Sequence, residues 1–320
     1  MPNNMKNHEV LLVGAGPMAM AYAKVLDALE IDYMVIGRGL ESARIFENTH
    51  NKKVLTGGLD SYLSKSRVDK SVQAIVAVDV ESLQPTLLSL HRSGVNKILI
   101  EKPAALSIDE LMLNRQEILT HSDSIFVAYN RRFYSSVLEV EELIKDDGGL
   151  QSMQFEFTEW THKIDPSKKR PDVLANWFFA NSTHVVNLAF FLGGKPELMA
   201  SFSKPGNLKW HEKTNFSGAG ITDKGVVFSY LSNWESAGRW SIELLTAKRR
   251  LFLKPLEGIG FQLRGTIPVV EHIFDDSLDR NYKPGLYKQV LAFLEGDSRR
   301  LVSIAEHIQD SENIYKKILS

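Results

Sequence analysis

A short apolar segment that leads directly into a glycine-rich turn and then a helix constrains this chain more than any other feature. Residues 8–13 (HEVLLV) have the length of a buried strand, and Gly14-Ala15-Gly16-Pro17-Met18-Ala19 follows at once. Apolar residues then recur with helical spacing as far as Leu29. In such a G-x-G-x-x-A turn the first glycine permits a tight turn, the second lets the backbone approach a pyrophosphate, and the small third residue lets the helix pack on the sheet. The alternative is a tight turn that binds nothing.

Strands and helices alternate through the first half of the chain. Further apolar runs of strand length are found at 33–36, 74–80, 97–100 and 125–129. Helical patterns separate them at 40–46, 85–91 and 108–119. Strands that are apolar throughout and spaced by helices are typical of a parallel sheet covered on both faces. The pattern predicts an α/β fold that begins with a doubly wound Rossmann sheet, in a dinucleotide-binding domain over residues 1–129.

The second half of the chain has a different pattern. Residues 153–157 (MQFEF) alternate between apolar and polar, as in a half-exposed antiparallel strand. Other expected strands are 225–234, 239–245 and 251–253, the first two joined by a turn at 235–238. Helices are expected at 182–192, 284–294 and 301–319. We therefore expect a second, α+β domain over residues 130–320, with a mostly antiparallel sheet and helices on one side.

Composition excludes several classes of function. The 320 residues include 38 basic and 39 acidic side chains, without the basic excess of a nucleic-acid-binding protein. The chain has no cysteine, which excludes disulfides, thiol nucleophiles and iron–sulfur clusters. No stretch approaches the roughly 20 apolar residues that span a bilayer, and the polar start MPNNMKNHEV does not resemble a secretory signal. Histidine spacing suggests no metal site, and serine-hydrolase and P-loop motifs are absent. We expect a cytoplasmic protein without membrane or nucleic-acid partners.

The end of the second predicted strand bears on the choice of dinucleotide. A site for NAD usually has an acidic residue about 20 residues beyond the glycines, where it binds the ribose hydroxyls. Here the strand ends Val35-Ile36-Gly37-Arg38, and Ser42 lies one helical turn further on. Arg38 could pair with a 2′-phosphate that a carboxylate would repel. This favours NADP over NAD, although Arg38 could instead be a solvated arginine at a helix start.

The predicted strand at 97–100, the fourth along the chain, is followed by Glu101-Lys102-Pro103. In open α/β sheets ligands bind at the carboxyl ends of the strands. An ammonium group held there by a stiff proline could bind a substrate hydroxyl or carbonyl and stabilise developing negative charge on oxygen. The residues expected to bind the dinucleotide are Gly14, Gly16, Pro17, Met18, Ala19, Gly37, Arg38, Ser42, Val78, Glu101 and Lys102.

Four motifs together resemble one family of oxidoreductases. They are Gly14-Ala15-Gly16, Glu101-Lys102-Pro103, Tyr129-Asn130-Arg131-Arg132-Phe133 and the helix around Ser182-Thr183-His184-Val185-Val186-Asn187. The combination resembles the Gfo/Idh/MocA family, which includes glucose–fructose oxidoreductase and inositol dehydrogenase, along nearly the whole chain. The resemblance implies a Rossmann domain followed by a domain with a large open sheet. It also implies a homo-oligomer, a dimer or tetramer, formed through that sheet.

The resemblance also implies catalytic roles. Lys102 matches the lysine that binds the reacting hydroxyl, and His184 matches the general acid or base. Histidine suits that role because it titrates near neutral pH, although His184 could instead be a capping or core histidine. Many members have aspartates at the positions that Ala180 and Asn187 occupy here. Their loss puts the proton relay in doubt and makes Tyr129 a further candidate, although a phenol ordinarily titrates near pH 10.

Several residues hint at a polar, sugar-like substrate that could be anionic. Arginine can bind a carboxylate or phosphate through two hydrogen bonds, and aromatic faces suit sugar rings. The candidate substrate-binding residues are Arg131, Arg132, Trp160, Trp177, Asn181 and Asn187. The tryptophans could equally be packing residues. The family resemblance points in the same direction, towards sugars, sugar acids and nucleotide sugars.

Three functions remain open. The first is an NAD(P)-dependent oxidoreductase that transfers hydride between nicotinamide and a hydroxyl or carbonyl carbon of such a substrate. The second is an NAD-dependent glycosidase on the same fold, which oxidises and re-reduces its sugar. The third is a non-catalytic NAD(P)-binding sensor, which the loss of two aspartates would suit.

Overall fold

The computed structural model describes residues 9–69, 71–95, 97–120 and 122–320. Contacts between residues divide this part of the chain into two compact units. The first unit contains the described residues up to Tyr129 together with Leu286–Ile308. The second contains Asn130–Gly285 and Gln309–Ser320. Residues 286–308, which the sequence analysis assigned to the second domain, thus belong to the first unit. His8 and the polar start of the chain lie outside the described residues.

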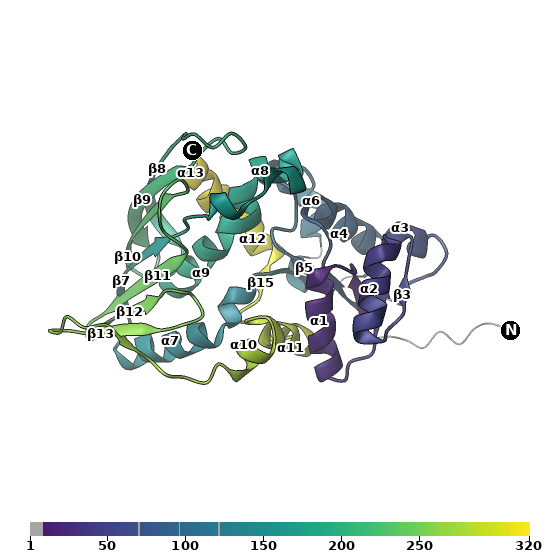
Figure 1. Ribbon diagram of the computed structural model, residues 1–320, viewed down its shortest axis with the longest axis horizontal. Coiled ribbons are helices and arrows are strands. Elements are labelled where there is room, and N and C mark those ends of the chain that lie inside the picture. Colours follow the sequence, from purple (N-terminus) through teal and green to yellow (C-terminus); the bar gives the residue numbers. More distant parts are fainter. Residues whose placement is uncertain (1–8, 70, 96, 121) are drawn as a thin grey trace. The chain divides into compact units, whose positions relative to one another are not determined.

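The first unit is built on a seven-stranded sheet (Figure 1). Its strands are β1 (Val10–Val13), β2 (Tyr33–Ile36), β3 (Val54–Leu55), β4 (Gln73–Val76), β5 (Ile98–Glu101), β6 (Ile125–Ala128) and β15 (Val302–Ser303). They lie in the order β3-β2-β1-β4-β5-β6-β15, and all pairs are parallel except β6 with β15. The order 3-2-1-4-5-6 is that of the doubly wound dinucleotide-binding fold, and it reverses direction at β1 and β4. The predicted α/β fold is therefore confirmed.

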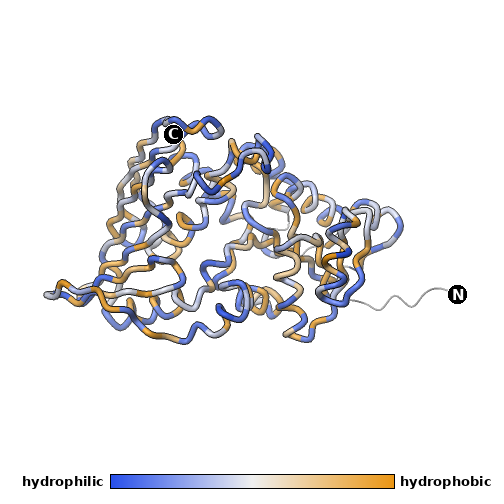
Figure 2. The backbone as a smooth tube through the Cα atoms, in the orientation of Figure 1, coloured by the Kyte–Doolittle hydropathy of each residue, from blue (hydrophilic) through white to orange (hydrophobic). Residues whose placement is uncertain are grey.

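Helices connect and cover this sheet. They are α1 (Pro17–Ala28), α2 (Leu40–His50), α3 (Gly58–Leu63), α4 (Leu83–Arg92), α5 (Ile108–Leu113), α6 (Arg115–Leu119) and α11 (Leu286–Glu295). A further helix, α12 (Ile304–Asp310), begins in the first unit and ends in the second. All four residues of β1 are buried, and the hydropathy of the backbone in Figure 2 follows the same pattern, with apolar strands inside. This burial explains why β1 is apolar along its whole length and the other strands are mostly apolar.

Several boundaries differ from the sequence-based prediction. The strand expected at 74–80 ends at Val76, because Ala77 makes the last bond to β1 and β1 itself turns away at Gly14. Residues Val80–Ser82 form a short 3-10 helix instead. The helix expected at 108–119 is divided at Asn114, and that expected at 301–319 begins with β15. The two-residue strand β3 was too short to predict.

The second unit is built on an eight-stranded sheet. Its strands are β7 (Leu150–Glu156), β8 (Pro196–Lys204), β9 (Asn215–Thr222), β10 (Val227–Asn233), β11 (Ser241–Thr246), β12 (Arg249–Leu253), β13 (Gly260–Leu263) and β14 (Val270–Glu271). The order is β14-β13-β12-β11-β7-β10-β9-β8, with β7 and β10 parallel and the other pairs antiparallel. The mostly antiparallel sheet is as predicted. Although a turn joins β10 to β11, the two strands do not pair, because β7 lies between them.

Helices pack on one face of this second sheet (Figure 1). The helices of the unit are α7 (Ser135–Asp146), α8 (Pro171–Ala175), α9 (Thr183–Gly193), α10 (Ser277–Asn281) and α13 (Lys316–Leu319). Two π-helical segments, Phe178–Ser182 and Ser311–Tyr315, lead into α9 and α13. Aromatic side chains such as Phe190 of α9 and Phe155 and Tyr230 of the sheet pack together. The opposite face of the sheet carries exposed apolar side chains.

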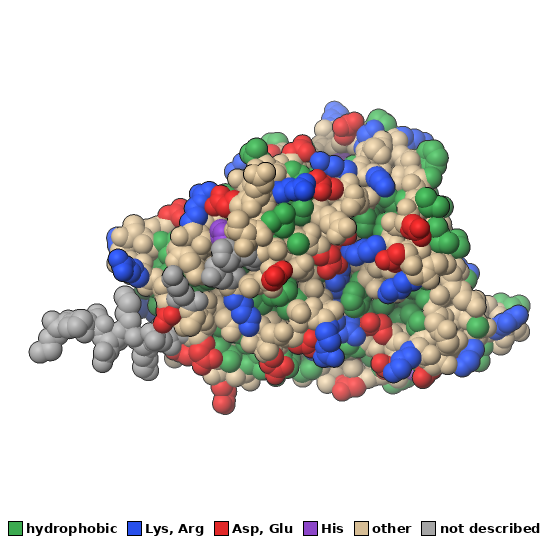
Figure 3. Space-filling model, turned by 180° about the vertical axis from the view of Figure 1, so that it is seen from behind, with side chains coloured by type: hydrophobic (Ala, Val, Ile, Leu, Met, Phe, Trp, Pro, Cys, Tyr) green, Lys and Arg blue, Asp and Glu red, His purple; other side chains and the backbone are tan. Residues whose placement is uncertain are grey.

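The surface shows no large patch of one charge on the face seen in Figure 3, where basic and acidic side chains are interspersed. This agrees with the balanced count of 38 and 39. Within the described ranges, no helix is both long and apolar enough to cross a membrane.

Candidate functional site

A cavity of about 720 Å³ opens at the carboxyl ends of β1, β2 and β4, where the strand order of the first sheet reverses. Ligands of doubly wound folds bind at this point. The residues that line it are Val13, Gly14, Ala15, Gly16, Pro17, Met18, Ile36, Gly37, Arg38, Gly39, Ser42, Gly57, Gly58, Leu59, Asp60, Ala77, Val78, Asp79, Glu81, Ser82, Pro85, Thr86 and Ser89. We call this the dinucleotide pocket.

Two glycines of the turn have different physical roles. Gly14 has a φ of +126°, and a Cβ there would lie 2.2 Å from the carbonyl oxygen of Ala77. The turn thus requires glycine for packing of the chain itself. A Cβ at Gly16, which lines the pocket, would meet no atom within 4 Å. Gly16 therefore leaves space for a ligand, and it precedes the first turn of α1, whose backbone N–H groups can bind phosphate.

Most of the predicted dinucleotide-binding residues line this pocket. Gly14, Gly16, Pro17, Met18, Gly37, Arg38, Ser42 and Val78 do so. Ala19 is fully buried, as expected of the small residue that lets α1 pack on the sheet. Glu101 and Lys102 lie at the end of β5 on the same edge of the sheet but do not line the pocket.

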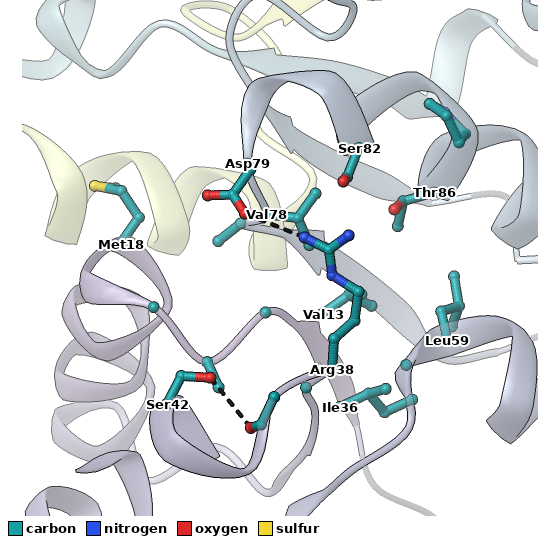
Figure 4. A pocket seen from close by; sticks show the side chains of 18 of the residues that line it. Val13, Met18, Ile36, Arg38, Ser42, Leu59, Val78, Asp79, Ser82 and Thr86 are labelled. Atoms are coloured by element: carbon teal, nitrogen blue, oxygen red, sulfur yellow. Dashed lines mark hydrogen bonds and ion pairs between the residues drawn. The ribbon is translucent and has the colours of Figure 1, made fainter. Parts of the chain in front are cut away.

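Sequence reasoning missed the polar residues that the segments after β3 and β4, including the starts of α3 and α4, contribute. Asp60, Asp79, Ser82 and Thr86 all line the pocket. Arg38 Nη2 donates to Asp79 Oδ2 at 3.1 Å, and both side chains are largely exposed (65% and 73%) (Figure 4). A carboxylate therefore does stand near the end of β2, but it comes from β4. The signal was an aspartate directly after an apolar run, which the overlong strand at 74–80 concealed.

A buried network surrounds the turn that carries Lys102. Tyr22, in α1, donates to Glu101 Oε1 at 2.7 Å. His307 Nε2 lies 2.9 Å from the carbonyl oxygen of Pro103, and its Nδ1 lies 3.4 Å from the Tyr129 hydroxyl. A carbonyl only accepts, so Nε2 donates, and Nδ1 of a neutral ring accepts from Tyr129. Sequence reasoning missed His307, which is distant in the chain from the motif it contacts.

His184 lies near the start of α9 and is buried, at 6% exposure. Its ring lies 6.1 Å from that of Trp240, between ring centroids. The Trp240 ring in turn lies 4.6 Å from the guanidinium carbons of both Arg131 and Arg239. One aromatic ring thus lies beside the candidate acid–base residue, and two guanidinium groups lie beside that ring.

A carboxylate that sequence reasoning missed lies close to the same helix start. Glu159 is 2% exposed and accepts hydrogen bonds from Asn181 Nδ2 (3.0 and 2.9 Å) and from Ser182 Oγ (2.7 Å). Arg239 Nη1 lies 3.7 Å from it. Burial raises the pKa of Glu159. The Ser182 hydroxyl, the charge of Arg239 and the Asn181 amide lower this pKa but do not outweigh burial. We call Glu159, Asn181, Ser182, His184, Arg239 and Trp240 the α9 cluster.

The other predicted substrate-binding residues have varied surroundings. Arg131 packs over Trp240, burial lowers its pKa, and no described group accepts a hydrogen bond from its buried Nε. Arg132 is buried and donates to Asn187 Oδ1 at 2.8 Å, so these two residues contact each other. Trp160 is 46% exposed, and its indole donates to the Gly238 carbonyl oxygen. Trp177 packs edge-on against Trp210.

The pocket fits a dinucleotide. It combines the open space above Gly16, a helix N-terminus without an acidic residue in its first turn, and hydroxyl, carboxylate and guanidinium groups that can bind ribose and phosphate. Within the described ranges, no group of three or more histidine, aspartate or glutamate side chains is arranged to hold a metal ion.

Sequence comparisons identify no relative. No family model matches the chain, and no curated protein matches its sequence.

Solved structures show what the fold is similar to. A protein assigned as an NADPH-dependent oxidoreductase from Desulfitobacterium hafniense has a TM-score of 0.77 at 15% identity, covering 99% of this chain and 96% of its own. An oxidoreductase from Agrobacterium radiobacter, in complex with NAD+, L-tartaric acid and magnesium, has a TM-score of 0.75 at 12% identity. The match covers 98% of this chain and 97% of that protein. Levoglucosan dehydrogenase with NADH has a TM-score of 0.73 at 15% identity, and the match covers 98% of this chain and 96% of that protein. The chain therefore shares, over nearly its whole length, the two-domain fold of these oxidoreductases.

Proposed function

We propose that this protein is an NAD(P)-dependent oxidoreductase that transfers hydride between nicotinamide and a hydroxyl or carbonyl carbon of a sugar-like substrate. The observation that carries the proposal is the dinucleotide pocket, in which Gly16 leaves open space beside a helix N-terminus. The similar solved structures support it, because they include complexes with NAD+ and NADH and a complex of levoglucosan dehydrogenase with L-sorbose.

When bound, the nicotinamide accepts or supplies the hydride. Lys102 would bind the reacting oxygen and stabilise its negative charge, and His184 would exchange the proton with that oxygen. The bonds around Glu101 and Pro103 support Lys102, because they tie the residues on either side of it to α1 and α12. The proposal requires that Lys102 and His184 act on the same substrate oxygen, which kinetics can test.

The α9 cluster offers a replacement for the aspartates that are absent at positions 180 and 187. Glu159 accepts hydrogen bonds from Asn181 and Ser182, which lie three and two positions before His184. We assign it the role of a positioning residue for the helix start that carries the acid–base group. Tyr129 is the weaker candidate for proton transfer, since its hydroxyl lies against His307.

NADP is the proposed cofactor and NAD the second choice. Arg38 and Ser42 both line the pocket, where Arg38 could bind a 2′-phosphate. The similar structures with bound NAD+ and NADH keep NAD as the alternative.

We also propose a homo-oligomer formed through the open face of the second sheet. Leu198, Ile221 and Val227 lie side by side across β8, β9 and β10, and Phe202 and Leu231 extend this apolar face. Phe202 is 70% and Leu231 60% exposed. A contiguous apolar face of this kind is usually covered by another protein surface. Phe202→Glu and Leu231→Lys should lower the mass measured by light scattering towards that of a monomer, whereas Leu113→Lys, at a still more exposed leucine of the first unit, should not.

A sensor that binds the dinucleotide without chemistry is the second candidate, and Ala180 and Asn187 are the residues that favour it. A turnover assay with NADPH and NADH against keto- and hydroxy-sugars, free and nucleotide-linked, separates the two. Oxidation or reduction of one panel member, lost in Lys102→Ala, supports the enzyme. Tight NADPH binding with no turnover on any panel member supports the sensor.

A further inference from the structure

The Arg38–Asp79 ion pair lies across the dinucleotide pocket. Arg38 follows β2 and Asp79 follows β4, and these strands flank β1 on either side. The glycine turn begins where β1 ends. The Arg38–Asp79 pair therefore joins the segment after β2 to the segment after β4, at the sheet edge where the turn lies (Figure 4). A dinucleotide bound along this edge would meet both side chains.

Among the described residues that line the pocket, Arg38 is also the one basic side chain, whereas Asp60, Asp79 and Glu81 are acidic. A 2′-phosphate entering the pocket would therefore have a single guanidinium to bind, and that guanidinium already has a carboxylate partner. Asp60 is engaged differently, since it accepts a hydrogen bond from the Ser89 hydroxyl at 2.9 Å.

We propose that Asp79 is a residue that determines cofactor specificity: its carboxylate competes with the 2′-phosphate of NADP(H) for Arg38. The proposal rests on the function proposed above. Binding of NADP(H) would then exchange one partner of Arg38 for another, while NAD(H) would leave the ion pair intact. Asp79 thereby reduces the preference for NADP that Arg38 alone would give.

The physical basis is the weakness of the pair. Both side chains are mostly exposed, and exposed ion pairs are only weakly stabilising. A phosphate carries more charge than a carboxylate and can bind a guanidinium through two hydrogen bonds, so it can displace Asp79. The displaced carboxylate nevertheless stays in the pocket and repels the phosphate. Its removal should therefore tighten NADPH binding by about three- to tenfold at moderate ionic strength.

The test measures the dissociation constants of NADPH and NADH by fluorescence titration of the full chain. The variants are Asp79→Asn, Arg38→Gln and the double variant. Asp79→Asn should tighten NADPH binding by about three- to tenfold and change NADH binding by less than about twofold. In the Arg38→Gln background the gain should be smaller, because the competition needs Arg38. Adenosine 2′,5′-bisphosphate should follow NADPH, and ADP should follow NADH.

A matched control is Asp60→Asn, which removes a carboxylate from the same pocket but not from Arg38. It should tighten NADPH binding by less than about twofold. Equal gains from Asp60→Asn and Asp79→Asn would overturn the competition and leave only a general charge effect. So would an unchanged NADPH affinity in Asp79→Asn. If the unaltered protein binds neither NADPH nor NADH, the proposed function itself fails, which is a distinguishable outcome.

Discussion

The dinucleotide pocket and the α9 cluster are built from different parts of the chain. Backbone forms much of the pocket. Gly14 and Gly16 shape the turn, and the backbone N–H groups at the start of α1 are available to bind a ligand. Side chains form the α9 cluster, in which Glu159 is held by residues 22 and 23 positions further along. The pocket is open, whereas Glu159 and His184 are buried. Substitutions should therefore act through backbone geometry in the first region and through buried polar partners in the second.

The largest effect on stability should come from the glycine turn. Gly14→Ala would place a Cβ 2.2 Å from the Ala77 carbonyl oxygen at a φ of +126°. Clash and backbone strain together should lower the free energy of unfolding by roughly 2–4 kcal/mol. Denaturant unfolding measures it. Gly16→Ala, whose Cβ meets nothing within 4 Å, should keep its stability and lose affinity for NADPH instead. Equal destabilisation by the two variants would contradict the separate roles of these glycines.

Activity should depend on both Lys102 and His184. Lys102→Ala should lower kcat by roughly 10²–10⁴-fold, because it removes the group proposed to stabilise charge on the reacting oxygen. Its NADPH affinity should change little, since Lys102 does not line the pocket. His184→Ala should lower kcat by a similar factor, and the double variant by little more than either single one, if both act on one oxygen. Full activity of His184→Ala would instead direct attention to Tyr129.

The buried carboxyl of Glu159 should make the stability of the chain depend on pH. Burial raises the pKa of this carboxyl in the folded chain. The folded state then binds the proton more tightly than the unfolded state, so this contribution to the free energy of unfolding falls as pH rises from the unfolded towards the folded pKa. Glu159→Gln should lack this fall, as urea unfolding at a series of pH values can show. Parallel pH profiles for the two proteins would contradict a raised pKa.

Glu159→Ala tests the positioning role in the same region. The donors of Asn181 and Ser182 would lose a buried acceptor, which should cost about 1–3 kcal/mol of stability. The kcat of this variant should fall while KM changes little, whereas Glu159→Gln, which keeps an acceptor oxygen, should restore part of kcat. A purely structural residue would move the unfolding free energy and leave kcat of the folded enzyme unchanged.

Local patterns were sufficient for much of the first unit. Continuous apolar strands predicted a sheet buried on both faces, and the glycine spacing placed its ligand edge, because both follow from neighbours in the chain. The same reasoning failed where a strand pairs with a partner that is far away in the sequence. The pattern at 301–319 predicts a helix where β15 lies, because its partner β6 is some 175 residues earlier. The pattern at 74–80 predicts too long a strand, because the pairing of β4 with β1, which ends at Val13, is not visible in the sequence.

The sequence by itself determined the doubly wound sheet, its glycine turn and the mostly antiparallel character of the second sheet, since apolar periodicity and glycine geometry are local. Only the tertiary structure decided which carboxylates matter. Asp79 reaches Arg38 across β1, and Glu159 reaches the start of α9. Likewise, His307 contacts the Pro103 carbonyl over 204 residues of chain. Ion pairs and hydrogen bonds form between groups that are close in space, and these groups have no fixed separation along the chain.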